Sequence, residues 1–475
     1  MGALTLVLWA CSGSGVGSNG TGETKQGSGV GTVTGFGSVI IDGVAYEDSQ
    51  AEVLIEDSLG NTSLTETKLG QRVEVTYEPT GTGRDLAKVI RVDASLMGPV
   101  GALDVGAGTL TVLGQTVQVN ADAALGPVTV FDETTKALSA VKVGDAVEVH
   151  AARKVVGGTT VLQATRVEVL GGLTQLRVSG PVTGLSASGF SLGALSVQLG
   201  AGVSVQPSRE ALVNDAWVLV YADPSNYTAS AMRLGATRIR VGERSTPVVV
   251  ADDAAVSGYV NAAPGGGQRF RVDGVWVLTD ASTVFDPAGS AAGVGRYVRA
   301  EGVYGSDGSL HASQVHVHSA DDDTVVNGTV VQLNTTTMVT FRVRDTWVHV
   351  QQPSGLDLSA CGASRLADGL YVTATGEMVA GVLEAASIVC KPEAVDSVVE
   401  REGSVVSVNA SARSLTLSLD GTSQVVQVRW SDTTFFRDLR QSDLMAGLRI
   451  DVEGKLSAAS GSSPAVLTAT KIKRD

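Results

Sequence analysis

Aromatic residues are scarce in this chain of 475 residues, where Phe, Tyr and Trp together make up 4%. Basic residues are outnumbered as well, with 35 Lys and Arg against 49 Asp and Glu and a net charge of -14. A surface of that sign does not neutralise phosphates, so we expect no nucleic acid as a partner. Beyond the first residues, the chain has no run of ~18 apolar residues, which argues against internal membrane-spanning helices.

Glycine, in contrast, is abundant, with 57 residues where a usual share of ~7% would give about 33. The hydrophobic fraction of 43% is high enough to build cores and argues against a disordered chain. Many glycines and few aromatics favour short strands and turns over helices. A chain of this length is also expected to divide into several domains.

A Gly-x-Val triplet recurs along the chain at a mean spacing of about 74 residues, which indicates internal repeats. Each copy later carries a turn glycine followed by alternating apolar residues, then a closing strand that begins at an alanine. The third copy departs, with Asn214 where the turn glycine is expected. The triplets begin at Gly31, Gly98, Gly180, Gly258, Gly328 and Gly403.

Within each copy, runs of period-two alternation are joined by hairpin turns such as Asp42-Gly43 and Asp273-Gly274. This pattern gives about five short strands per copy and predicts an all-β fold of six tandem small five-stranded OB-like β-barrels. We expect the barrels to follow one another as a string. The predicted divisions are a signal remnant and Gly/Ser tether over 1–30, then repeats 1 to 6 over 31–95, 96–171, 176–243, 254–319, 324–392 and 398–475.

Several segments resemble the bacterial family called domain of unknown function 5666, namely 31–46, 110–123, 143–151 and 272–286. The resemblance extends loosely over 29–475. It implies small β-barrels in tandem, in an envelope protein that often has a lipoprotein signal. It implies no activity, because none is assigned to that family.

The first eleven residues resemble the end of a bacterial lipoprotein signal, with Leu8, Ala10 and Cys11 in the places of the lipobox. The resemblance implies lipid on Cys11, and Ser12 after it implies the outer membrane, with the protein facing the periplasm or the exterior. No basic residue precedes Lys25, so we expect translation to start further upstream. The alternative is a soluble protein with an apolar amino terminus.

With Cys11 lipidated, Cys361 and Cys390 remain as one pair. An oxidising compartment would let them form a disulfide. The alternative is two separate buried thiols, because Cys390 occupies an inward position that valine holds in other copies.

Sequence motifs for a phosphate-binding loop, a His-Glu-x-x-His metal site and a Cys-x-x-Cys pair are missing. We therefore expect no enzyme, no cofactor and no metal. His311, His316 and His318 precede the acidic run 321–323 and could hold a metal ion, but their positions accept any polar residue in other copies. We interpret them as a solvated face, and the acidic runs 321–323 and 400–402 as solvated linkers.

Trp276 and Trp347 align with outward positions of their strands, and Arg342 and Arg344 lie close to the second in sequence. Flat aromatic side chains on this face of an OB barrel can stack on sugar rings. They can equally pack between neighbouring barrels, which is the interpretation we favour.

We therefore expect a non-catalytic envelope lipoprotein that acts as a structural or interaction element. Its expected partners are the membrane, through the lipid, and an envelope protein or polysaccharide. The alternative is a surface lipoprotein that binds carbohydrate or another small ligand.

Overall fold

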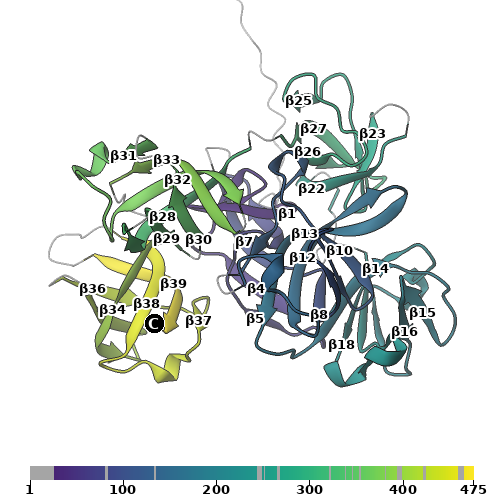
Figure 1. Ribbon diagram of the computed structural model, residues 1–475, viewed down its shortest axis with the longest axis horizontal. Helices are drawn as coiled ribbons and strands as arrows, with labels where there is room; N and C mark the ends of the chain where they lie inside the picture. The colour runs from purple at the N-terminus through teal and green to yellow at the C-terminus, as the bar shows by residue number, and fades with distance from the viewer. Residues whose placement is uncertain are drawn as a thin grey trace, which may run out of the picture.

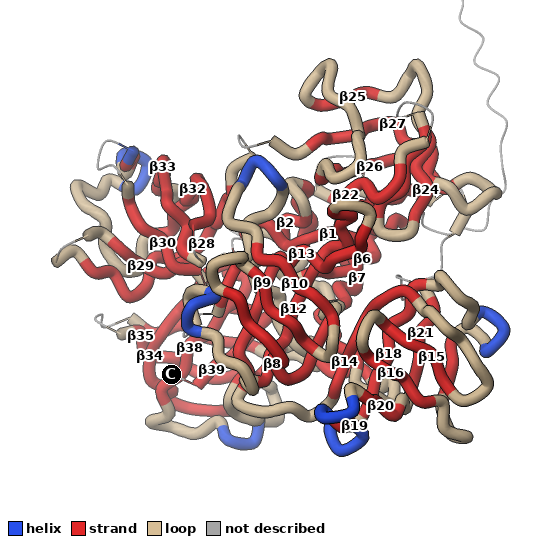
Figure 2. Tube along the Cα trace, turned by 45° about the vertical axis from the view of Figure 1, so that its right-hand side comes forward, coloured by secondary structure: helices blue, strands red, loops and turns tan. Residues whose placement is uncertain are grey.

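The structure is a computed structural model, and its strands confirm the predicted all-β class (Figure 2). The helical elements are three-residue 3-10 turns, and within the described ranges none could cross a membrane. The described residues are 26–80, 84–132, 135–242, 249–250, 252–264, 268–319, 322–336, 338–344, 346–351, 355–379, 381–392, 398–420, 424–457 and 465–474.

Repeat 1 shows the strand order that recurs along the chain. An antiparallel meander is formed by β1 (Gly27–Phe36), β2 (Val39–Ile41) and β3 (Val44–Glu47). Both β3 and β4 (Glu52–Glu56) pair in parallel with β7 (Asp85–Val92), and the short β5 (Thr62–Leu64) pairs with β4. β6 (Arg72–Glu78) lies between β7 and β1 and is antiparallel to both.

Repeats 2, 4, 5 and 6 use the same order, whereas in repeat 3 the hairpin strands belong to a separate four-stranded sheet; the strands are as follows. Repeat 2 contains β8 (Leu96–Asp104), β9 (Thr109–Val112), β10 (Gln115–Val119), β11 (Val130–Phe131), β12 (Ala146–Val156) and β13 (Thr159–Leu170). Repeat 3 contains β14 (Leu176–Pro181), β15 (Gly189–Leu192), β16 (Leu195–Gln198), β17 (Ser204–Gln206), β18 (Trp217–Ala222), β19 (Tyr227–Thr228), β20 (Arg233–Gly235) and β21 (Arg238–Val241). Repeat 4 contains β22 (Asp253–Ala262), β23 (Arg269–Val272), β24 (Val275–Leu278), β25 (Val284–Asp286), β26 (Tyr297–Tyr304) and β27 (Leu310–Val317). Repeat 5 contains β28 (Thr324–Asn334), β29 (Thr340–Val343), β30 (Thr346–Val350), β31 (Leu356–Asp357), β32 (Tyr371–Val379) and β33 (Val382–Cys390). Repeat 6 contains β34 (Val398–Asn409), β35 (Ser414–Leu419), β36 (Val425–Arg429), β37 (Phe435–Arg437), β38 (Arg449–Leu456) and β39 (Val466–Arg474).

The two sequence landmarks of each repeat are joined by a pair of backbone hydrogen bonds. In repeat 1 the Gly70 N–H donates to the Val33 carbonyl at 2.8 Å, and the Val33 N–H donates to the Gln71 carbonyl at 2.8 Å. The turn residue has a positive φ, which favours glycine. The equivalent bonds from turn residue to triplet valine are Gly144 to Val100, Asp215 to Val182, Gly295 to Val260, Gly369 to Val330 and Gly447 to Val405.

Repeat 3 therefore uses Asp215, not Asn214, at the turn position. Asp215 has a φ of 67°, and aspartate tolerates this left-handed conformation better than most residues. The Asn214 side chain instead accepts a hydrogen bond from the Leu185 N–H at 3.0 Å. The predicted alignment of this repeat was wrong by one residue.

The repeats are packed side by side and do not form the expected string (Figure 1). β1 continues in parallel pairing with β22 and, at its other end, with β28. The pairing with β22 begins at Gly27, so 27–30 form strand and not the flexible tether that we predicted. Repeats 2 and 3 are joined by antiparallel pairing of β8 and β14.

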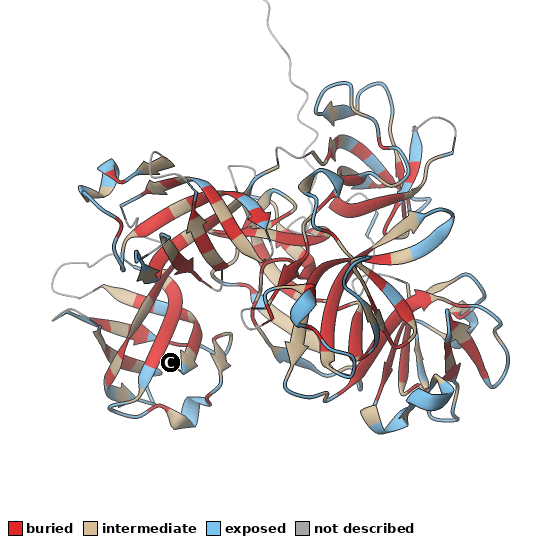
Figure 3. Cartoon of the chain, viewed as in Figure 1, coloured by how far each residue is buried: buried red, intermediate tan, exposed pale blue. Residues whose placement is uncertain are grey.

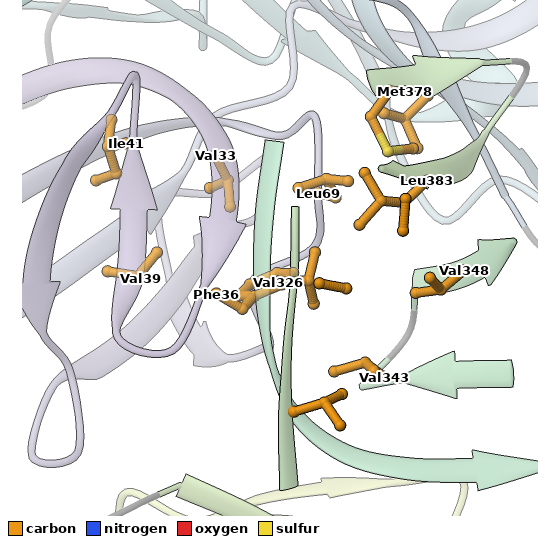
Figure 4. Packing of buried hydrophobic residues seen from close by; sticks show 14 of the residues in the cluster. Val33, Phe36, Val39, Ile41, Leu69, Val326, Val343, Val348, Met378 and Leu383 are labelled. Carbon is orange, nitrogen blue, oxygen red and sulfur yellow. The ribbon is translucent and has the colours of Figure 1, made fainter. Parts of the chain in front are cut away.

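Buried side chains follow the alternation of the strands, while the hairpin tips and loops are exposed (Figure 3). The hydrophobic cores are shared between repeats. In Figure 4, Val33, Phe36 and Leu69 of repeat 1 belong to the same cluster as Val326 and Leu383 of repeat 5. A second core joins repeats 2 and 3, whereas repeat 4 has its own and repeat 6 has one that includes Tyr371 of repeat 5. Burial across repeats thus supports a packed assembly.

Candidate functional site

Repeat 1 has charged or polar contacts with several neighbours, and its contact with repeat 4 is buried. The Arg72 guanidinium forms an ion pair with Asp273 and donates to the Ser257 carbonyl at 3.0 Å. The Tyr297 hydroxyl of repeat 4 donates to Asp42 at 2.9 Å. Burial raises the pKa of the Asp42 carboxyl, and the nearby charge of Arg72 opposes that rise.

The contact between repeats 1 and 2 has a carboxylate held by two cations. Glu168 accepts from Lys68 at 2.8 Å and from Arg166 at 3.0 Å. Arg166 also donates to the Leu69 carbonyl at 3.0 Å. Burial by itself raises the pKa of Glu168, but Arg166 and Lys68 outweigh it and lower this pKa to about 2. The carboxylate therefore stays ionised at neutral pH.

Repeat 3 meets repeat 1 through Glu56 and Asp93. Glu56 accepts from Arg238 at 2.8 Å and from the Tyr221 hydroxyl at 3.0 Å. Asp93 accepts from Arg240 at 2.6 Å and pairs with the buried Arg177. Pairing of this kind offsets the cost of removing these charges from water.

Repeat 6 contacts repeat 1 through Lys471, whose ammonium lies 3.2 Å from Glu66. Repeat 6 also contacts repeat 5. The guanidinium of Arg342 in repeat 5 lies 3.5 Å from Glu400, 3.7 Å from Glu402 and 3.7 Å from Asp451, which all belong to repeat 6. Repeat 1 thus lies against each of the other five repeats, since β1 also pairs with β28 of repeat 5.

The structure corrects two predictions at the contact between repeats 5 and 6. Arg342 and Arg344 are only 4% and 5% exposed, so they are not part of an open ligand face. Arg344 lies 3.2 Å from Glu453. Glu400 is 2% exposed within β34, so the run 400–402 is not a solvated linker.

The three carboxylates around Arg342 have the spacing of a possible metal site, with one oxygen from each within 4.8 Å of the others. Burial and the neighbouring Asp451 raise the pKa of Glu400. The Arg342 guanidinium, however, already lies beside all three carboxylates, which makes it the cation of this cluster.

The predicted histidine face is partly buried and paired. His316 lies between two carboxylates, 2.9 Å from Asp286 and 2.9 Å from Asp322. His318 lies 2.7 Å from Asp322 and 2.7 Å from the Ala123 carbonyl of repeat 2. These groups line a cavity of about 410 Å³ between repeats 1, 2, 4 and 5. His311 is more than half exposed and lies apart from this cavity.

The two tryptophans have different surroundings. Trp276 on β24 is half-buried, and the Arg269 guanidinium lies over its ring at 4.1 Å. Trp347 on β30 lines a second cavity, of about 520 Å³, formed where repeats 1, 2, 5 and 6 meet. We call this the Trp347 cavity. The sequence identified this aromatic residue, but not the charged residues from other repeats that face it.

Cys361 and Cys390 form a disulfide, with their Cα atoms 5.9 Å apart. Cys11 and the lipobox lie outside the described residues. One stretch, Gly189-Phe190-Ser191-Leu192-Gly193, has the Gly-x-Ser-x-Gly spacing of hydrolase nucleophiles. Ser191 lies in the β15–β16 hairpin opposite Ser196, however, and not on the strand-to-helix turn that such a nucleophile requires.

Fold and site together define an all-β tandem-repeat protein whose repeats pack around the first. The model of the family described as "Domain of unknown function (DUF5666)" matches residues 97–168, 257–316 and 402–473. These segments lie in repeats 2, 4 and 6 and support the predicted tandem copies of this domain. Repeats 1 and 5 share the strand order outside the matched segments, whereas the hairpin of repeat 3 lies in a separate sheet.

No curated protein matches the chain. Among solved structures, one similar chain is described as a "multidomain protein with nucleic acid binding domains" from Streptococcus pneumoniae TIGR4. The two are 9% identical, and the match covers 46% of this chain and 73% of the other, with a TM-score of 0.12. A likeness at that score carries no argument about fold or function.

Proposed function

We propose that this protein is a non-catalytic structural or interaction element of the cell envelope, held by lipid on Cys11 at the outer membrane. The observation that carries the proposal is the position of repeat 1, which contacts all five other repeats through strand pairing or ion pairs. Side chains of opposite charge are paired at these contacts and hold the repeats together. This pairing supports a rigid body that presents its outer surfaces to a partner.

Each repeat is, in this proposal, a small OB-like barrel with the divisions that the sequence predicts, except that repeat 1 begins at Gly27. The pairings of repeat 1 support it, because they run from β1 through β2 and β3 to β7 and return through β6 to β1. Closure of this kind would leave few exposed strand edges.

Solution scattering on the full chain tests the rigid body. Size scaling gives a radius of gyration of about 23 Å for a compact chain of this length. A string of six barrels of ~25 Å would give about 43 Å. A value near the larger figure would contradict the proposal.

Palmitate labelling tests the anchor. The chain is expressed with its upstream coding region in a bacterial host and compared with its Cys11→Ala variant. We expect label in the first and none in the second. Equal labelling, or none in either, would remove the lipid anchor and the outer-membrane location.

The second candidate function is binding of carbohydrate or another small ligand, and the Trp347 cavity favours it. Its volume of about 520 Å³ lies within the usual range of small-molecule sites, ~300–1,000 Å³. Tryptophan fluorescence on addition of envelope glycans tests it, because a purely structural body should give no saturable change.

A further inference from the structure

We propose that the Trp347 cavity binds a saccharide that carries a carboxylate, such as a uronic acid residue of an envelope polysaccharide. This inference rests on the second candidate function and names the class of ligand. It depends on three features of the cavity: an aromatic platform, an excess of basic side chains and a lining shared by four repeats.

The platform is Trp347, which belongs to the second strand of a hairpin, β29–β30. The neighbouring Val348 is buried in the core of repeat 5, which fixes the strand that carries the indole. Leu69 of repeat 1 and Met378 of repeat 5 supply further apolar lining. Apolar faces of sugar rings stack on aromatic platforms of this kind, and the hydroxyls of Thr340 and Thr346 offer polar partners nearby.

Basic residues outnumber acidic residues in the lining, which differs from the acidic chain as a whole. The lining contains Lys68, Lys136, Arg166 and Arg437 against Asp132 and Glu168. Glu168 is already held by Lys68 and Arg166, and Asp132 accepts from the Thr135 hydroxyl at 2.6 Å and the Val169 N–H at 2.9 Å. Arg437 lies 3.1 Å from Glu66, just outside the lining, so the positive charge that a ligand would meet at the rim comes from Lys136. This charge favours an anionic group on the ligand.

Lys136 is the residue best placed to recognise that anion without holding the fold. It is exposed, and it lies on the segment of repeat 2 that faces the β32–β33 hairpin of repeat 5. A Cβ at Gly381 in that hairpin would lie 3.7 Å from the Lys136 carbonyl oxygen. The rim of the cavity therefore comes from two repeats, and binding requires their packed arrangement.

The cavity of about 410 Å³ lined by His316 and His318, which we call the histidine cavity, suits such a ligand less well. Its lining contains five carboxylates, and its two histidines are already paired with Asp286 and Asp322. A ligand carboxylate there would meet a surplus of negative charge. The Trp347 cavity is therefore the better site for an acidic saccharide.

Calorimetric titration of the full chain with trigalacturonic acid, and with its methyl ester, tests the inference. The two probes share their rings and differ in charge. We expect saturable binding of the acid and at least tenfold weaker binding of the ester. Trp347→Ala should weaken binding of both probes, and Lys136→Glu should weaken binding of the acid at least tenfold. Lys142→Glu, which makes the same charge change at another exposed position of repeat 2, should leave binding unchanged.

The outcomes distinguish failure of the acidic ligand class from failure of the ligand-binding function itself. Equal binding of acid and ester, lost in Trp347→Ala, would overturn the acidic class and keep a ligand-binding function. Binding that Trp347→Ala leaves unchanged would overturn this site, and no binding of either probe would overturn the inference altogether. Circular dichroism melts of each variant show whether a loss of binding reflects a loss of fold.

Discussion

Gly70 of repeat 1 lies so close to Thr165 of repeat 2 that a Cβ at Gly70 would be 2.5 Å from the Thr165 carbonyl oxygen. The same glycine has a φ of 82° and closes the backbone bond to Val33. One position thus serves both the turn of its own repeat and the contact with the next. In repeat 2 the equivalent Gly144 has a φ of 95° but no atom near its missing side chain.

Gly70→Ala should therefore destabilise the protein more than Gly144→Ala. The positive φ costs each variant about 1–2 kcal/mol. Gly70→Ala should add about 1–3 kcal/mol, because repeat 2 must move away from the new methyl group. Thermal melts of the two variants measure the difference. Equal losses would show that Gly70 and Thr165 are not in contact.

Arg72→Met should lower the free energy of unfolding by about 3–5 kcal/mol, because it removes the main partner of Asp273 at a buried contact. The double variant Arg72→Met with Asp273→Asn should recover part of this loss, since asparagine carries no charge and tolerates the positive φ of position 273. Denaturant titrations of the single and double variants give the coupling between the two residues. Additive losses would contradict a direct ion pair.

The repeat and the strand class were predictable from the sequence because both depend on local periodicity. The alternation of residues such as Val73 and Val75 and the spacing of turn glycines lie within one repeat. The alignment of repeat 3 failed because a glycine was sought, and Asp215 takes the same left-handed conformation.

The packing of the repeats was not predictable, because the residues that hold it look like solvated charges in the sequence. Arg342 and Glu400 are separated by 57 intervening residues and become buried partners only in the fold. Trp347 was found as an outward aromatic residue. Its cavity, however, needs Lys68, Lys136 and Arg437, which come from three other repeats and share no sequence signal with it.

The protonated form of His316 should stabilise the fold, so the free energy of unfolding should fall as the pH rises through the pKa of this histidine. Hydrogen bonding to Asp322 raises its pKa, burial and Arg299 oppose the rise, and Asp286 adds to it. Because the folded pKa lies above the ordinary value of 6.5, this contribution is fully present below pH ~6.5 and is lost as pH rises through the folded pKa. Burial by itself raises the pKa of Asp322, but His316 and His318 outweigh it and lower this pKa, so its contribution is present above pH 3.8 and is lost as the pH falls below that value.

Melting temperatures at pH 5.5 and 8.5 test this prediction. We expect the wild-type decrease between these values to shrink in His316→Gln. His311→Gln is the matched control, because that side chain is 55% exposed and should leave the decrease as it is. An unchanged decrease in His316→Gln would show that its protonation does not contribute to folding.

The disulfide should stabilise repeat 5 by restricting the unfolded chain. Cys361 and Cys390 are 29 positions apart, and closing a loop of that length corresponds to about 3–4 kcal/mol. Cys361→Ala with Cys390→Val isolates this effect, because other repeats place valine in the buried position of Cys390. Denaturant titrations with and without a thiol reductant, after unfolding and refolding in the same buffer, provide the measurement. The reductant should lower the stability of the wild type towards that of the variant and leave the variant unchanged. A wild type that is equally stable in both buffers would contradict a structural disulfide.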